Sequence, residues 1–173
     1  MPVWTDKIRP NAIAFQGPGW SGTWQAVSDQ NDLTYAQTQY PSSTYFTFFF
    51  DAAFWMTQMT ALHRVEVTIR VNRNNAPIGA VTVIQYSGTR YNGSTFVPPF
   101  DPNFGEQSHI WATRPGTLTP WAVNDLPLIG FGIYAGGDAT YPTIVRMSET
   151  WIRLEIDPIV TRKTFLFPRA QVT

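Results

Sequence analysis

The chain has 173 residues, enough for one domain with a sizeable hydrophobic core, and its composition contains no break that suggests a second domain. Its 12 basic residues balance its 12 acidic ones, which argues against nucleic acid or an anionic membrane as a partner, because both attract a cationic excess. The absence of cysteine excludes disulfides and thiolate metal sites.

The composition also predicts a sparsely charged surface that is rich in aromatic rings. Charged residues make up 14% of the chain and aromatic residues 15%, whereas an average soluble domain has roughly 25% charged residues. Ten of the 12 basic residues are arginine, a cation favoured at protein interfaces because its planar group stacks and makes paired hydrogen bonds. We therefore expect neighbouring proteins to cover much of this surface; a small sandwich with an aromatic core is the alternative.

No targeting or membrane segment is expected. No apolar run approaches the length of about 18 residues that a membrane span needs. Asp6, Arg9 and Pro10 interrupt any apolar core of a signal peptide near the start. We expect a chain that is made in a cytoplasm and does not use the general secretory pathway.

The first part of the chain predicts an arm followed by strands. Residues 1–20 are rich in proline and glycine and are expected to be extended, with a short strand at 12–15. Strands are expected at 23–27 and 31–37, and the apolar run 45–50 is typical of a strand buried on both faces. Helical turns are expected somewhere in 52–61, which has few β-branched residues.

The stretch 62–71 carries the strongest pattern. Val65, Val67, Ile69 and Val71 alternate with polar residues, so a strand would place all four on one face. Residues 79–86 are expected to return as its hairpin partner after the turn cluster at 72–77.

The second half predicts a long loop and several more strands. Residues 87–105 are rich in glycine, asparagine and proline, and are expected to form a functional loop with at most a short strand at 94–97. Further strands are expected at 107–113, 122–125, 129–134 and 144–156. The last of these changes the parity of its apolar residues midway, which predicts a β-bulge near 149–151.

These elements predict an all-β protein, an antiparallel β-sandwich of jelly-roll type with extended N- and C-terminal arms. The expected division is an N-terminal arm at 1–20, the sandwich at 21–157 and a C-terminal arm at 158–173. The last arm is too apolar to remain in water, so we expect it to pack against a neighbouring protein or back onto the body of the sandwich. Its expected interface residues are Ile159, Val160, Phe165, Leu166 and Phe167.

The sequence offers little catalytic chemistry. His63 and His109 have no carboxylate at a useful spacing, and no nucleophile elbow or phosphate-binding glycine loop is present. Asp29 and Asp32 are weak candidates for a calcium site, and could formally be a glycosidase pair, but a turn with local hydrogen bonds is the favoured interpretation. We expect no enzyme activity, no cofactor and no established metal site.

Aromatic side chains near the loop-rich regions are the candidate ligand or partner contacts. Flat rings stack on sugar faces and equally on proteins, and the sequence does not separate the two uses. The candidates are Trp55, Tyr91, Phe96, Phe100, Phe104 and Trp111.

The order of several segments resembles jelly-roll domains of phage virion proteins. The resemblance begins with Trp24-Gln25-Ala26-Val27-Ser28-Asp29-Gln30-Asn31-Asp32-Leu33-Thr34-Tyr35, continues through the aromatic strand 45–50 and the strand 65–71, and includes 121–126, 131–133 and 145–156. It covers roughly residues 20–157. The group shades into lectin-like sandwiches and comprises capsid decoration or cement proteins and tail modules.

The resemblance implies a non-enzymatic structural protein of the virion, most simply a capsid decoration or cement protein. Its expected partners are the major capsid protein or other virion proteins, with a homo-oligomer, guessed as a trimer, and neither nucleic acid nor membrane. Alternatives are a carbohydrate-binding, lectin-like module for host or glycan recognition, a hydrolase on the same scaffold, and a genome-packaging capsid protein. This sequence lacks the basic arm that is usual in a genome-packaging capsid protein.

Overall fold

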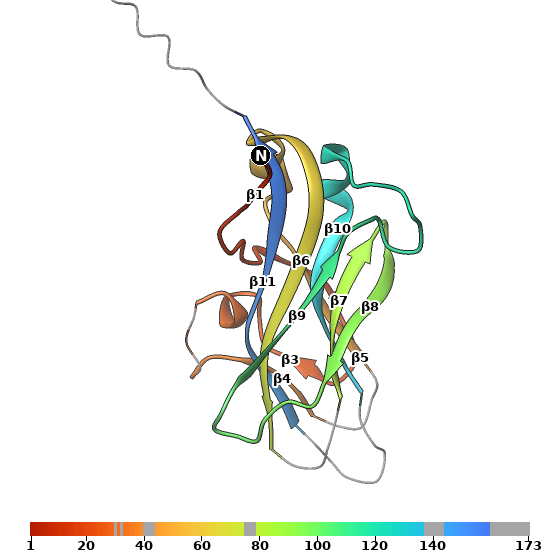
Figure 1. The fold of residues 1–173 in the computed structure, drawn as a ribbon. Helices are drawn as coiled ribbons and strands as arrows, with labels where there is room; N and C mark the ends of the chain where they lie inside the picture. Colours follow the sequence, from red (N-terminus) through yellow and green to blue (C-terminus); the bar gives the residue numbers. More distant parts are fainter. Residues whose placement is uncertain (30, 32, 40–43, 75–78, 137–143, 160–173) are drawn as a thin grey trace, which may run out of the picture.

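Two antiparallel sheets pack face to face in a jelly-roll sandwich (Figure 1). The computed structural model describes residues 1–29, 31, 33–39, 44–74, 79–136 and 144–159. In the described residues, sheet A has the strand order β3-β4-β11-β6-β9, with β1 also paired to β11, and sheet B has the order β2-β5-β10-β7-β8. The all-β sandwich expected from the sequence is confirmed.

The elements have the following bounds. The strands are β1 (Val3–Trp4), β2 (Ala12–Gln16), β3 (Trp20–Ser21), β4 (Ala36–Gln39), β5 (Thr44–Phe49), β6 (Met59–Arg73), β7 (Ala80–Tyr86), β8 (Thr89–Phe96), β9 (Gly105–Trp111), β10 (Ile129–Ala135) and β11 (Ile144–Pro158). The helices are α1 (Ala52–Met56) and the 3-10 turns η1 (Gln25–Val27) and η2 (Val123–Leu128). None of the helices among the described residues is long and apolar enough to cross a membrane.

The alternating stretch at 62–71 lies within β6, the long strand at the centre of sheet A. Val65, Val67, Ile69 and Val71 are fully buried between the sheets, as the period of two predicts. Both neighbours of β6 in the sheet are antiparallel to it, β11 on one side and β9 on the other. Sheet A therefore presents the polar residues of three adjacent strands on its outer face.

The parity change in β11 is a β-bulge, located slightly before the predicted position. The register with β6 shifts between Met147 and Glu149. Met147 points inward before the shift and Thr150, Ile152 and Leu154 are buried after it. The extra residue lets both apolar halves of the strand face the same core.

Two expected strands are 3-10 turns. At 23–27, Trp24 has helical dihedrals, and the amide of Val27 donates to its carbonyl at 3.2 Å. At 122–125 the Asp125 carboxylate accepts a hydrogen bond from the amide of Ala122 at 2.7 Å and closes the turn. Both strand predictions were wrong. Each turn buries one large apolar side chain, Val27 in η1 and Leu126 in η2, so the apolar residues reach the core without forming a strand.

The expected long loop at 87–105 is largely a strand. Ser87 and Gly88, with φ of 50° and 83°, make a tight turn, and β8 then pairs with β7 along 89–96. The remaining segment, 97–104, is tied to the end of β6. The amide of Arg73 donates to the carbonyl of Pro99 at 3.0 Å, and its Nε donates to the carbonyl of Pro98 at 2.7 Å.

The N-terminal residues belong to the sandwich. β1 pairs with β11, β2 with β5 and β3 with β4. Ile8 is buried in the core and bridges to Ile152. The expectation of an arm at 1–20 that reaches outward is corrected for this chain, because its backbone hydrogen bonds are made to its own sheets. The division into 1–20, 21–157 and 158–173 otherwise stays a prediction.

Candidate functional site

The outer face of sheet A carries an ordered array of polar side chains. Antiparallel register aligns Trp151 with Thr68 and Thr68 with Ser108. The next pairs along the strands join Arg153 with Glu66 on one side and Arg70 with Glu106 on the other. Because side chains alternate between the faces of a strand, these residues all point away from the core.

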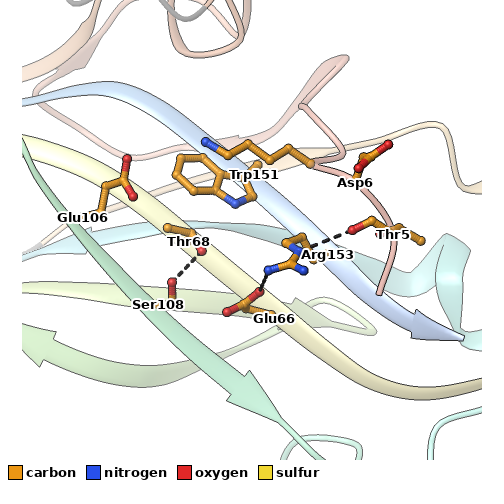
Figure 2. A pocket seen from close by; sticks show the side chains of 9 residues that line it. Thr5, Asp6, Glu66, Thr68, Glu106, Ser108, Trp151 and Arg153 are labelled. Carbon is orange, nitrogen blue, oxygen red and sulfur yellow. Dashed lines mark hydrogen bonds and ion pairs between the residues drawn. The ribbon is translucent and has the colours of Figure 1, made fainter. Parts of the chain in front are cut away.

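A groove of about 360 Å³ lies on this face, walled on one side by the segment 5–8, here called the strap. Three strands of sheet A form its floor, and Figure 2 shows the side chains of these strands and of the strap gathered around it. The lining residues are Thr5, Asp6, Lys7, Glu66, Thr68, Glu106, Ser108, Trp151 and Arg153.

Backbone hydrogen bonds fix the strap along the edge of β11. The amide of Thr5 donates to the carbonyl of Leu154 at 2.9 Å, and Ile8 and Ile152 exchange two hydrogen bonds of 2.9 and 3.0 Å. Arg153 Nε adds a hydrogen bond to the carbonyl of Thr5 at 3.3 Å. The groove wall is therefore built from this chain's own backbone.

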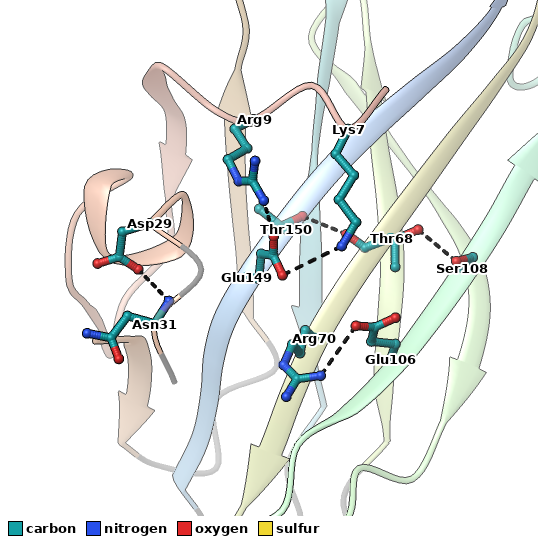
Figure 3. A network of polar contacts seen from close by, with 10 residues as sticks. All are labelled: Lys7, Arg9, Asp29, Asn31, Thr68, Arg70, Glu106, Ser108, Glu149 and Thr150. Atoms are coloured by element: carbon teal, nitrogen blue, oxygen red, sulfur yellow. Dashed lines mark hydrogen bonds and ion pairs between the residues drawn. The ribbon is translucent and has the colours of Figure 1, made fainter. Parts of the chain in front are cut away.

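The groove floor combines hydroxyls, carboxylates and cations in fixed pairs. Thr68 Oγ1 and Ser108 Oγ are 2.7 Å apart, and Arg153 Nη1 donates to Glu66 Oε2 at 3.2 Å. Arg70 Nη1 lies 3.3 Å from Glu106 Oε1 (Figure 3). The two ion pairs neutralise their own charges, and all three pairs retain lone pairs or donor hydrogens that can turn to a ligand.

One aromatic ring lies in the groove and a second lies beside it. Trp151 is on the floor, with the ammonium of Lys7 3.6 Å from its ring centroid. Trp4 on β1 lies 5.4 Å from the guanidinium of Arg64 and 5.3 Å from that of Arg153, measured to its ring centroid. Arg153 thus links the groove to the Trp4 ring.

The outer face of sheet B is closed by its own side chains. Thr47 and Val83 point outward there, yet both are fully buried. The Arg90 guanidinium of β8 lies 3.7 Å from the ring centroid of Phe15 on β2, although three strands separate these edges. The sheet must curl to bring them together, and the rings fill its concavity. Sheet A keeps the open polar face.

The six aromatic residues named from the sequence do not gather at this groove. Trp111 is buried in the core, and Trp55, Tyr91 and Phe96 pack against it from the side. Phe100 is exposed, and its ring centroid lies 4.0 Å from the guanidinium of Arg73. The ring centroid of Phe104 lies 5.7 Å from the guanidinium of Arg70. Tyr91 and Phe96 were expected in a loop, but they lie on β8 and pack against the core.

The calcium candidates are only partly described. Asp29 accepts hydrogen bonds from the amide of Asn31 at 3.0 Å and from the hydroxyl of Thr34 at 2.5 Å, so its carboxylate supports a local turn. Asp32 lies outside the described residues. Within the described part of the chain, no group of three or more histidine, cysteine or acidic side chains could hold a metal ion.

The expected interface residues are likewise only partly described. Ile159 is exposed just after β11, where its amide donates to the carbonyl of Gln58 at 3.0 Å. Val160, Phe165, Leu166 and Phe167 lie outside the described residues.

His63 does have a carboxylate neighbour across the strands: Asp157 Oδ2 is 3.0 Å from its Nε2 on the surface.

The groove residues were missed from the sequence although a signal for them existed. The polar positions of β6, namely Arg64, Glu66, Thr68 and Arg70, alternate as cleanly as its valines. A polar outer face is the ordinary condition of a half-buried sheet. Only the strap's position beside β11 shows that this particular face is hollowed.

Comparison with known proteins gave structural likeness alone. No protein-family model and no curated protein matches the chain. A xylan-binding domain from Paenibacillus barcinonensis has a TM-score of 0.49 and 9% identity over 90% of this chain and 94% of its own. A family 29 carbohydrate-binding module from Piromyces equi has a TM-score of 0.43 and 8% identity over 87% and 90%. At these values the likeness carries no argument about a ligand.

Proposed function

We propose that this protein is a carbohydrate-binding module whose ligand lies in the groove on the outer face of sheet A. The observation that carries the proposal is the groove itself, where hydroxyls, carboxylates, cations and an indole face one cavity. A saccharide presents hydroxyl groups that both donate and accept hydrogen bonds, and C–H faces that stack on rings. The groove offers partners for all three.

The charge pairing favours a neutral ligand. Glu66 is paired with Arg153, Glu106 with Arg70 and Glu149 with Arg9. Such side chains can receive sugar hydroxyls without holding a large net charge in the groove. A phosphate or polyanion would instead meet the carboxylates of both strand β6 and strand β9.

Binding fits the carboxylate geometry better than hydrolysis does. Glu66 pairs in register with Ile110, whereas Glu106 pairs with Arg70. The backbone positions of the two glutamates are thus offset by four residues, about 13 Å along the strands at 3.3 Å per residue. Inverting glycosidases place their carboxyl groups about 6.5–9.5 Å apart and retaining enzymes closer still.

A glycan array followed by calorimetry tests the proposal. Arg153→Met should weaken binding of an array hit at least tenfold, corresponding to about 1.4 kcal/mol, because it removes a groove donor. Arg146→Met is the matched control, since Arg146 is also on β11 and also ion-paired, with Asp101 at 2.7 Å, but does not line the groove. A silent array at millimolar glycan, or equal losses in both variants, would refute the proposal.

The second candidate is the virion structural protein that the phage resemblance implies. A specific observation favours it. Three large apolar side chains are exposed on segments that contact one another: Phe54 on α1, Leu128 in η2 and Ile159 after β11. α1 contacts η2, and Ile159 is hydrogen-bonded to Gln58 just beyond α1. Apolar residues at this end would gain about 25 cal/mol per Å² on burial against a neighbouring subunit, before ordering costs.

Removal of residues 159–173 tests this second candidate. If the segment anchors the protein on a particle, occupancy and particle stability should fall when virions are assembled with the shortened chain. Light scattering of the purified full chain supplies an independent measurement of self-association. Unchanged occupancy, together with a monomeric mass, would remove the structural role.

A further inference from the structure

The indole of Trp151 carries a flexible charged side chain over one of its faces. The ammonium of Lys7 lies 3.6 Å from its ring centroid. Trp151 is only 4% exposed, whereas the Lys7 side chain is 43% exposed. The Trp151 ring at the groove floor (Figure 2) is therefore hidden from solvent, and a partly exposed lysine occupies one of its faces.

The backbone that carries Lys7 is held on both sides of it. Thr5 and Ile8 donate amide hydrogen bonds to the carbonyls of Leu154 and Ile152, each at 2.9 Å. Thr5 also accepts one from the amide of Leu154 through its Oγ1 at 3.0 Å. Movement of the strap would break these bonds, whereas rotation within the Lys7 side chain breaks none of them.

The electrostatic hold on Lys7 is weak. Glu149 Oε1 accepts a hydrogen bond from Arg9 Nη2 at 2.6 Å, so this carboxylate already has a strong cationic partner (Figure 3). Its other oxygen is 3.9 Å from the Lys7 ammonium, at the outer limit of an ion pair. The contact with the ring is the closer of the two, and a cation held over a ring by a partly exposed side chain is only weakly bound.

We infer that Lys7 is a displaceable cap on the stacking face of Trp151 and so determines which saccharides the groove accepts. This inference rests on the proposed function. A neutral pyranose ring replaces the ammonium on the indole, and Lys7 turns toward Glu149 or a ligand hydroxyl. A saccharide without an apolar C–H face cannot displace the cap and is excluded from the ring.

Calorimetry with cellohexaose and xylohexaose, both neutral β-1,4-linked chains, tests the cap. Lys7→Ala should bind the better of the two about two- to fivefold more tightly than the natural protein, because no cation–ring contact is lost on binding. Lys7→Arg keeps a cation that stacks on the ring and should bind like the natural protein. Equal affinity of all three proteins, or weaker binding by Lys7→Ala, overturns the inference.

A second measurement tests the contact between Lys7 and the Trp151 ring in the absence of any sugar. By NMR, the ε-methylene protons of Lys7 should resonate upfield through the ring current of Trp151 and return to ordinary values in Trp151→Leu. Ordinary shifts in the natural protein overturn the inference while leaving the proposed function standing. Absence of binding by every variant, with a silent glycan array, overturns both.

Discussion

His109 lies on the inner face of β9, where the open side of the sandwich meets β8. Its Nδ1 is 2.9 Å from the hydroxyl of Ser94, and its ring meets that of Trp111 edge-on at 4.3 Å between centroids. Burial lowers the pKa of His109 below its ordinary value of 6.5. The folded protein therefore keeps this imidazole neutral at a pH where the unfolded chain protonates it.

We predict that stability falls on acidification because of His109. Between its folded pKa and 6.5 the unfolded chain binds more protons than the folded one, so the free energy of unfolding rises with pH across that window. The contribution of His109 to the free energy of unfolding is fully present above pH 6.5 and is lost as the pH falls from 6.5 to the folded pKa. Below the folded pKa it no longer changes with pH. Urea unfolding between pH 7.5 and 5 measures the slope.

The control for this prediction is His109→Gln, which keeps a polar side chain near Ser94 but does not titrate. Its free energy of unfolding should change less with pH over the same range. A natural protein whose stability is flat from pH 7.5 to 5, or a variant with the same slope, would contradict the assignment to His109.

Gly132 is required by close backbone approach within sheet B. A Cβ at this position would lie 2.1 Å from the carbonyl oxygen of Phe46 and 3.0 Å from the Cα of Thr47. Gly132→Ala should lower the free energy of unfolding by about 1–3 kcal/mol or more, because backbone must move to admit the methyl group. Gly136→Ala is the matched control, since its new methyl would meet Tyr134 at an ordinary 3.4 Å. Chemical denaturation giving equal values would contradict this reading.

At the scale of elements, Asp125 ties η2 to two other parts of the chain. Its carboxylate accepts hydrogen bonds from the hydroxyl of Tyr86 on β7 at 3.0 Å, from Nε of Arg114 at 2.7 Å and from the amide of Ala122 at 2.7 Å. The residue is buried, so the three donors have no ready replacement in water.

Asp125→Ala should therefore lower the free energy of unfolding by about 2–4 kcal/mol, because it leaves buried donors without partners. Asp51→Ala is a matched control: this aspartate also caps a short helix, but it is exposed and accepts a hydrogen bond from the amide of Phe54 alone, at 3.1 Å. It should cost about 1 kcal/mol. Equal losses of the free energy of unfolding in the two variants, measured by urea unfolding, would show that the hydrogen bonds of Asp125 contribute no more than an ordinary helix cap.

The elements also show where local patterns mislead. Asp125 was assigned to a strand on its neighbours' apolar character, but its carboxylate closes a turn whose partners lie on β7 and at Arg114. Residues 87–105 were assigned to a loop with at most a short strand at 94–97, yet β8 begins at Thr89 and pairs with β7 on both sides of a register shift. In both cases a contact made elsewhere in the chain outweighed local propensity.

At the scale of the whole molecule, the N-terminal residues complete both the core and the groove. Ile8 is buried, and Thr5, Asp6 and Lys7 form one groove wall. Removal of residues 1–8 should lower the free energy of unfolding by at least about 2 kcal/mol, the worth of burying one isoleucine, and should abolish glycan binding. Denaturation and calorimetry on the shortened chain measure both. Retained affinity would show that the strap does not form the site.

What the sequence by itself determined is the layer structure. The alternation through Val65 to Val71 and the parity change around Ser148 fix which face of each long strand is buried, because burial of apolar side chains follows a period of two wherever one face is wet. These signals are local, and the residues alone predicted both, although the bulge lies between Met147 and Glu149, slightly before its predicted position.

What only the tertiary structure decided is the site. The groove joins Lys7 to Trp151 and Glu66 to Arg153, residues 144 and 87 positions apart in the chain, through strand pairing that no local pattern encodes. The same pairing draws residues 1–20 onto their own sheets and turns Trp111 into the core. Register between distant strands is set by the sum of core contacts, so a surface assembled from several strands becomes visible only once the sheet has formed.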